Sequence, residues 1–336
     1  MKKILAVAVL AAVSAFAVVG CRQKVEGTGK RRIAVIPKGT THIFWKSIHA
    51  GAVKAEQEFK DLSVQVIWKG PMKEDDRESQ IRVMEGFITG KVSGIVLAPL
   101  DDEALRGSVE EAVRNGIPVV IIDSDLKSEK YVSFVATDNY LGGRKGGKRL
   151  AEILGGKGKV IMLRYQVGSA STTNREKGFM DVLKEEYPQI EVVSANQYAG
   201  ATTESAYKAS ENLLAPLRTP DGGLTIDGIF CPNESSTFGM LRALQDSGLA
   251  GKVKYVGFDS SENLVEALRK GHIHGLVLQD PINMGYLGVK TMVEHLQGKK
   301  VENRIDTGSE VATPENMNEP RIKSLLEPDF KKWLKE

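Results

Sequence analysis

The chain has 336 residues, of which 41% are hydrophobic and 26% are charged. This composition is typical of a globular protein of about two domains and excludes a disordered chain. A formal net charge of +3 excludes a broad nucleic-acid-binding surface, and two cysteines are too few for a disulfide scaffold or a four-cysteine zinc site.

An apolar segment opens the chain. Residues 4–19 form an apolar run behind Lys2 and Lys3. The run is shorter than the ~20 residues of a membrane span and is typical of a secretory signal peptide, the alternative being an uncleaved N-terminal anchor. It ends in Val-Val-Gly-Cys, which resembles the bacterial lipobox, and this resemblance implies cleavage before Cys21 and lipidation of its thiol. We therefore predict a signal peptide at 1–20 and a lipidated tether at 21–30.

Short apolar runs alternate with amphipathic stretches along the rest of the first half. The predicted strands are 33–37, 63–68, 94–99, 118–123 and 131–136. The predicted helices are 44–59, 74–90 and one that Asp101 or Asp102 caps and that ends at Asn115 and Gly116.

The same alternation repeats in the second half. The predicted strands are 159–163, 190–195, 228–231, 254–258 and 274–278, and the predicted helices are 174–186, 202–214, 234–247, 262–270 and one from Pro281 to about Gly298. Continuous apolar strands between helices indicate parallel sheets covered on both faces. We predict an α/β protein of two doubly wound parallel-sheet lobes, with Cys231 in a strand as a core residue.

Ligands of such sheets bind beyond the carboxyl ends of the strands. Hydrogen-bonding or aromatic side chains follow six of the ten predicted strands, in both halves: Lys38, His42, Phe44, Trp45, Asp123, Ser124, Thr173, Arg175, Asn233, Asp259 and Gln279. Carboxylates and amides exchange hydrogen bonds with hydroxyl groups, and an aromatic face covers the apolar face of a sugar ring. This set favours a polyhydroxylated ligand.

Each candidate also has a structural alternative. Asp123, Asp259 and Asn233 can cap the segments that they precede, while Phe44 and Trp45 can be core residues of the first helix. Their recurrence at corresponding strand ends in both lobes favours the binding interpretation.

The ordered series of segments resembles the type I periplasmic sugar-binding proteins, in the ribose-binding group. The segments IAVIPKGTTHIFWKSIHAGA, IPVVIIDSD, FCPNESSTFGMLRALQ, VGFDSSE and GLVLQDPINMGYLGV carry the likeness. The resemblance places the family's ligand positions on the candidates above other than Lys38. It also implies a three-strand hinge, with one lobe at 31–137 plus 280–305 and the other at 138–279 plus 306–336.

The sequence departs from the ribose-type pattern at two positions. Ser124 and Thr173 stand where that pattern has arginines. The segments IPK and DSD are similar instead to the autoinducer-2 and rhamnose-binding branch, in which a lysine and an aspartate contact the ligand. This similarity makes Lys38 a candidate and argues against ribose itself, because a site built for one hydroxyl pattern leaves buried polar groups unpaired with another.

We predict an extracytoplasmic, lipid-anchored receptor that captures a monosaccharide or polyol between its lobes and delivers it to the permease of an ABC importer. The alternative is a sugar or autoinducer-2-type receptor coupled to chemotaxis or to a sensor kinase. The sequence shows no nucleophile–base pair, metal cluster or complete phosphate-binding loop, so we expect a monomeric binding protein, not an enzyme, with no cofactor, no metal and no nucleic-acid partner.

Overall fold

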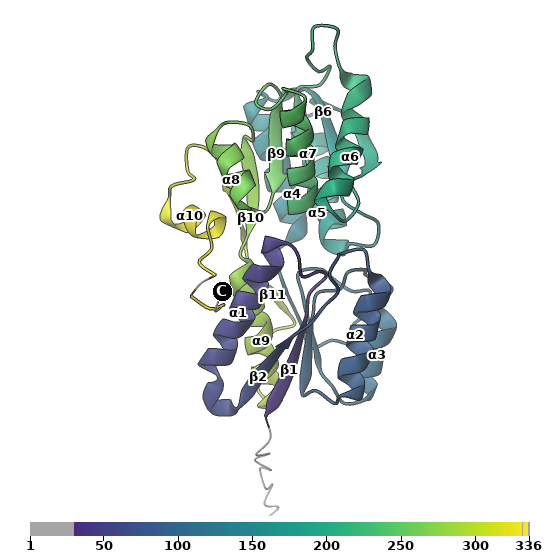
Figure 1. Cartoon of the computed structure of the whole chain (residues 1–336), viewed down its shortest axis with the longest axis vertical. Coiled ribbons are helices and arrows are strands. Elements are labelled where there is room, and N and C mark those ends of the chain that lie inside the picture. The colour runs from purple at the N-terminus through teal and green to yellow at the C-terminus, as the bar shows by residue number, and fades with distance from the viewer. Residues whose placement is uncertain (1–29, 331, 335–336) are drawn as a thin grey trace, which may run out of the picture.

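The chain folds into two lobes stacked end to end, each built on its own six-stranded sheet (Figure 1). The computed structural model describes residues 30–330 and 332–334. The predicted signal peptide and Cys21 lie outside the described residues. Within the described residues, no helix is long and apolar enough to cross a membrane.

The first sheet has the strand order β11-β5-β4-β3-β1-β2, and all of its pairings are parallel. Its strands are β1 (Arg31–Ile36), β2 (Val64–Trp68), β3 (Gly94–Leu97), β4 (Val119–Ile122), β5 (Ser133–Ala136) and β11 (Arg304–Asp306). Its helices are α1 (Ile43–Glu58), α2 (Arg77–Thr89), α3 (Arg106–Arg114) and α9 (Pro281–Leu296), with a 3₁₀ turn η1 (Lys60–Leu62) after α1. Helices α1 and α9 pack on one face and α2 and α3 on the other, so this lobe is the predicted doubly wound unit.

The second sheet has the order β12-β10-β9-β8-β6-β7. Its strands are β6 (Lys157–Arg164), β7 (Gln189–Tyr198), β8 (Gly228–Phe230), β9 (Lys254–Phe258), β10 (Gly275–Gln279) and β12 (Ser309–Ala312). Its helices are α4 (Asn139–Ile153), α5 (Ala170–Glu186), α6 (Thr203–Leu214), α7 (Glu234–Asp246), α8 (Glu262–Arg269) and α10 (Pro320–Leu326), with a 3₁₀ turn η2 (Ala215–Leu217). The edge strand β12 runs antiparallel to β10, whereas the other pairings are parallel.

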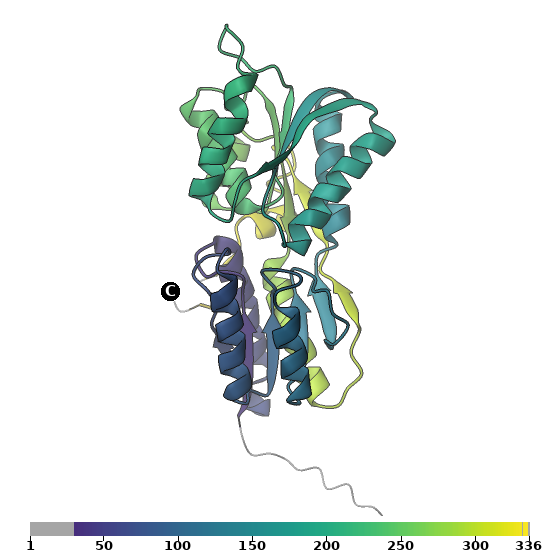
Figure 2. The same cartoon turned by 90° about the vertical axis from the view of Figure 1, so that its right-hand side faces the viewer.

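Central strands of both sheets are buried on both faces, which explains their unbroken apolar sequences. All four residues of β3 and of β4 are buried, and helices cover both sides of each sheet in the second view (Figure 2). In the second lobe the rings of Phe179 and Phe230 stack with centroids 4.3 Å apart, and Cys231 is fully buried in the core, as predicted.

The chain passes between the lobes after β5, after β10 and after β11, always at the same edge of both sheets. Two of these crossovers are tied together, since Asp138 N donates to Asp306 Oδ1 at 3.0 Å and Thr137 Oγ1 donates to Gly308 O at 3.2 Å. This edge is therefore the hinge side of the molecule, and the free strands β2 and β7 mark the opposite side.

Three helices begin three or more residues away from their predicted starts. Helix α2 begins at Arg77 because Asp76 caps it by accepting from Ser79 N. Asp101 accepts from two backbone N–H groups in a separate turn, so α3 begins later, at Arg106. Helix α5 begins at Ala170, four residues before the predicted start, and this changes which of its side chains face the other lobe.

Candidate functional site

A polar cavity lies between the lobes, at the carboxyl ends of the strands of both sheets. Side chains from both lobes line it: Lys38, His42, Phe44, Trp45, Glu74, Asp123, Tyr165, Ser169, Ser171, Thr172, Arg175, Asn233, Glu234, Asp259 and Gln279. Nine of the eleven residues predicted as ligand contacts are in this set, and Ser124 and Thr173 are not.

Two aspartates occupy equivalent places in the two lobes. Asp123 follows β4 and Asp259 follows β9, and both have left-handed backbones, with φ of 62° and 66°. A non-glycine residue in this region costs about 1 kcal/mol or more, and such strain persists where the surrounding structure fixes it, often at binding sites. The sharp turn points each carboxylate into the cavity instead of continuing the strand.

Each aspartate lies near a buried cation. Lys38 Nζ is 2.7 Å from Asp123 Oδ2, and Arg175 NH1 is 3.8 Å from Asp259 Oδ2. Gln279 Nε2 also donates to Asp259 Oδ1 at 2.7 Å. Burial raises the pKa of Asp259, while the Arg175 charge and the Gln279 hydrogen bond act in the opposite direction. The pairs present donors and acceptors side by side, which suits a ligand hydroxyl that both donates and accepts.

Arg175 is held rigidly. Its Nε donates to Asn139 Oδ1 at 2.8 Å, its NH1 donates to Pro232 O at 3.0 Å, and its guanidinium lies 4.0 Å from the centre of the Phe258 ring. Only 2% of the residue is exposed. Arg175 is therefore a buried cation that its neighbours hold in place.

The aromatic pair has both a core and a cavity role. Trp45 is buried in the core of the first lobe, and its Nε1 donates to Glu74 Oε1 at 2.8 Å. The half-buried Phe44 packs edge-on against it, with ring centroids 5.0 Å apart. Both rings also line the cavity.

Asn233 similarly combines two roles. It is the N-cap of α7, where its Oδ1 accepts from Ser236 N in a capping box, and it lines the cavity as well. The capping alternative from the sequence is thus observed together with a place in the cavity wall, and the Nδ2 group of this buried residue donates to Ser235 Oγ at 3.1 Å.

Glu74 is the most connected residue that the sequence analysis missed. Its carboxylate accepts from Trp45, lies 3.0 Å from His42 Nδ1 and accepts from the Tyr165 hydroxyl of the other lobe at 2.8 Å. Glu74 lies in the loop before α2, six residues after β2, so its place in the chain does not mark it as a residue at a strand end. Tyr165 follows β6 directly, and a correct end for that strand would have identified it.

A charged cluster of His42, Glu74 and Glu234 joins the lobes, since His42 Nδ1 is also 3.7 Å from Glu234 Oε2. Burial alone would lower the pKa of His42, but the hydrogen bond and charge of Glu74, with Glu234 and Asp259, raise it to about 9. Burial would raise the pKa of Glu74, but the His42 contact lowers it to about 2. Burial raises the pKa of Glu234 to about 6. His42 is therefore a cation at neutral pH and Glu74 an anion.

Two predicted ligand contacts lie outside the cavity wall. Thr173 is exposed on the outer side of α5, and Thr172 lines the cavity in its place, because the early start of α5 fixes a different helical phase. Ser124 is fully buried, and its Oγ accepts from Ser171 N of the other lobe at 3.0 Å. Ser124 thus joins the lobes instead of lining the cavity.

Further hydrogen bonds cross the cleft. Lys38 Nζ donates to Ser171 Oγ at 3.1 Å, Gln166 Nε2 donates to Glu74 O at 2.9 Å, and Asp102 N donates to Gly168 O at 2.9 Å. Together with the Tyr165–Glu74 bond, they show that the structure is a closed conformation, in which the cavity walls from the two lobes meet.

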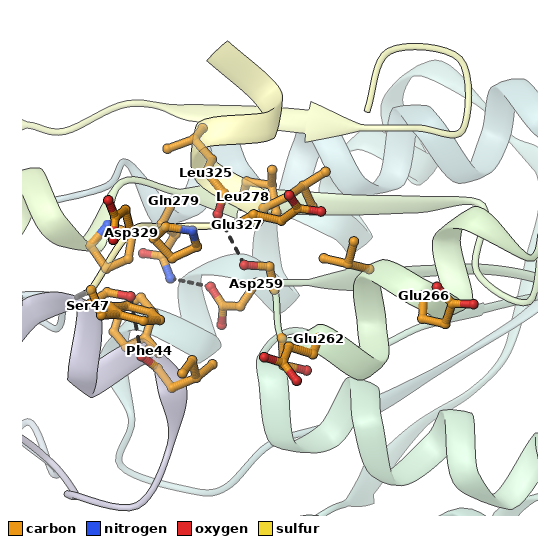
Figure 3. Close-up of a pocket in the computed structure, with 18 of the residues that line it drawn as sticks. Phe44, Ser47, Asp259, Glu262, Glu266, Leu278, Gln279, Leu325, Glu327 and Asp329 are labelled. Carbon is orange, nitrogen blue, oxygen red and sulfur yellow. Dashed lines mark hydrogen bonds between the residues drawn. The ribbon is translucent and has the colours of Figure 1, made fainter. Parts of the chain in front are cut away.

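A groove lies beside the cavity, between the start of α1, helix α8 and the segment that follows α10 (Figure 3). Phe44, Asp259 and Gln279 line both the groove and the cavity. The C-terminal segment contacts both lobes here, since Glu327 pairs with Arg269 of α8 at 3.6 Å and the Trp333 ring lies 6.0 Å from Lys54 Nζ of α1.

Known proteins share both the sequence pattern and this architecture. Residues 33–300 match the family described as "Periplasmic binding protein domain". The D-allose-binding periplasmic protein of Escherichia coli K12 is 30% identical over 276 residues, which cover 80% of this chain and 85% of that protein.

Two solved structures of solute-binding proteins are also similar to this chain in sequence and fold. A carbohydrate transporter solute-binding protein of Agrobacterium radiobacter, in complex with D-arabinose, has 35% identity and a TM-score of 0.83, covering 89% of this chain and 100% of that one. An ABC transporter solute-binding protein of Agrobacterium vitis, with bound D-fucose, has 34% identity and a TM-score of 0.82, covering 88% and 99%. The chain therefore belongs to the periplasmic binding protein family, in its type I, sugar-binding branch.

Proposed function

We propose that this protein captures a monosaccharide or related polyol in the cavity between its lobes and delivers it to the permease of an ABC importer. The single observation that carries the proposal is the cavity itself, since each lobe contributes a buried aspartate, a cation and further hydrogen-bonding groups to one small polar space. Only the closed state makes both sets of contacts, so a ligand that bridges them shifts the population toward closure.

The donor set favours a neutral sugar. Asp123, Asp259 and Glu74 each have a cationic neighbour in the cavity, so no strong cation is left over to pair with an acidic ligand. Trp45 and Phe44 supply ring surface for the C–H face of a sugar. The relatives named above bind D-allose, D-arabinose or D-fucose by their descriptions.

We further propose that the mature protein begins at a lipidated Cys21 and works outside the cytoplasm as a monomer. The apolar run, the Val-Val-Gly-Cys sequence and the extracytoplasmic relatives support this part of the proposal. Mass spectrometry of the N-terminal peptide from membranes tests it, and an unmodified Met1 would refute it.

A binding screen tests the main proposal. Calorimetry with D-ribose, D-allose, D-arabinose, D-fucose, deoxysugars, xylitol and autoinducer-2 should find at least one ligand of about micromolar affinity, which corresponds to ~8 kcal/mol. Asp259→Ala should weaken that affinity by a few kcal/mol, and Trp45→Ala should weaken it too. If no compound of the panel binds, the sugar assignment is refuted. Uptake that survives deletion of the gene would favour the signalling alternative.

A further inference from the structure

The two most exposed large apolar side chains among the described residues are Met72 and Val167, which are 72% and 67% exposed. Met72 lies in the loop between β2 and α2 of the first lobe, and Val167 lies in the loop between β6 and α5 of the second. Isolated apolar side chains on a surface are ordinary. These two are notable because they lie on facing loops of different lobes.

Interlobe bonds bring these loops together. Gln166, the neighbour of Val167, donates to the backbone of Glu74 at 2.9 Å, and Arg77 NH2 donates to Val167 O at 3.2 Å. None of these bonds uses the side chain of Met72 or of Val167, and neither side chain lines the cavity. Both apolar groups therefore remain available on the outside of the closed molecule.

The sheet topology makes their separation sensitive to closure. All three crossovers lie at the β11–β5 edge of one sheet and the β12–β10 edge of the other, whereas β2 and β6 lie at or next to the opposite edges. A rotation about the hinge moves the far side of the cleft by the largest distance. A rotation that opens the cleft would therefore move the loop of Met72 away from the loop of Val167.

We propose that Met72 and Val167 form the apolar anchor by which the closed, loaded protein docks on the permease of its importer. This inference rests on the proposed function. A partner that must distinguish loaded from empty receptor gains most from contacts that only the closed state provides. A stable second copy of the chain would need ~1,200–2,000 Å² of buried surface, and two side chains amid exposed charges such as Lys73, Asp76 and Arg77 suit a transient contact better.

The test compares ligand binding with uptake. A gene that encodes the double variant M72D/V167D replaces the chromosomal gene. The full-length wild-type and variant proteins are also purified in detergent for calorimetry. Radiolabelled D-ribose, D-allose, D-arabinose, D-fucose and xylitol serve as probes. We expect the affinity of M72D/V167D for the bound probe to stay within twofold of the wild type, and uptake of that probe to fall at least tenfold.

The matched control is V113D/L141D, which places the same charges on exposed apolar residues of the two lobes away from this rim. It should retain both affinity and uptake. If the aspartates themselves alter ligand affinity, M72Q/V167T removes apolar surface without adding charge.

The outcomes distinguish failure of the docking anchor from failure of the proposed importer function. Normal uptake with M72D/V167D and with M72Q/V167T overturns the docking anchor alone, as does an equal loss with V113D/L141D. A wild-type dimer that these variants convert to monomer, with uptake unchanged, assigns the surface to a second copy and overturns it too. If deletion of the gene leaves the uptake of every probe unchanged, the proposed importer function fails and the anchor fails with it.

Discussion

The hydrogen bond from Tyr165 to Glu74 gives the sharpest test of the closed structure. It joins the second lobe to the first over 2.8 Å, and Tyr165 is 1% exposed. Burial and the Glu74 charge raise the pKa of Tyr165 well above its usual value, so its hydroxyl remains a proton donor at neutral pH. Tyr165→Phe removes this hydroxyl and leaves the ring in place.

The expected magnitude follows from the charge of the acceptor. A hydrogen bond to a charged group contributes ~1.5–3 kcal/mol net. In the open state both groups reach water, so the loss falls on the closed state, and through it on ligand affinity. At 1.4 kcal/mol for each factor of ten, Tyr165→Phe should weaken the affinity for sugar by ~10- to 150-fold.

Calorimetry with the sugar that binds the wild type measures this effect. Tyr255→Phe is the matched control, because the Tyr255 hydroxyl is equally buried but donates at 2.7 Å to Thr237 O within the same lobe. This control should lower the melting temperature and leave the affinity within about twofold. An unchanged affinity in Tyr165→Phe, or the same loss in both variants, would refute the role assigned to the interlobe bond.

Three further predictions follow from the site. The pKa of His42 is raised from 6.5 to about 9 in the folded state, so protonated His42 stabilises the fold by up to ~3 kcal/mol. This stabilisation is complete below pH 6.5 and is lost as the pH rises through 9. Melting temperatures measured across this range should fall with rising pH, and His42→Gln should abolish this pH dependence. A Cβ on Gly143 would lie 1.9 Å from Arg175 O, so Gly143→Ala should displace α5 and reduce sugar affinity at least tenfold. Gly86 of α2 has open space around it, so Gly86→Ala should stabilise the fold by ~0.5–1 kcal/mol and leave the affinity unchanged. Equal effects of the two variants on affinity would contradict the packing argument. Thr172→Val should weaken sugar binding several-fold while Thr173→Val leaves it unchanged, and the reverse order would contradict the observed phase of α5.

The fold was predictable because its sheets are buried on both faces. That burial demands nearly continuous apolar strands, and such strands stand out between amphipathic helices. Strand β12 was harder to predict because it is a short edge strand with alternating exposure and pairs antiparallel with β10. Its sequence carries no signal that separates it from a loop.

The site was predictable only where adjacency in the chain determines adjacency in space. Lys38, Asp123, Asp259 and Gln279 lie at or just beyond strand ends, so the parallel sheets bring them to one edge regardless of side-chain detail. Glu74 reaches the cavity through the course of a long loop, which no local pattern encodes.

The starting residue of helix α5 also limited how well the site could be predicted. A helix that starts at residue 174 and one that starts at 170 carry the same apolar periodicity, but they place the threonines beside Arg175 differently. The family resemblance placed the ligand contact on Thr173, whereas in α5, which begins at Ala170, Thr172 lines the cavity.

The two aspartates with left-handed backbones belong to charge pairs that the fold itself provides. Asp123 and Asp259 adopt left-handed backbones at the ends of β4 and β9, and these sharp turns orient their carboxylates. Their neighbours Lys38 and Arg175 partner these buried charges. A sugar hydroxyl placed between such a pair would exchange hydrogen bonds without leaving a charge unpaired, and the contacts across the cleft would stabilise the closed state further. We therefore expect the interlobe contact of Glu74 and Tyr165 to add to the ligand affinity by stabilising the closed state.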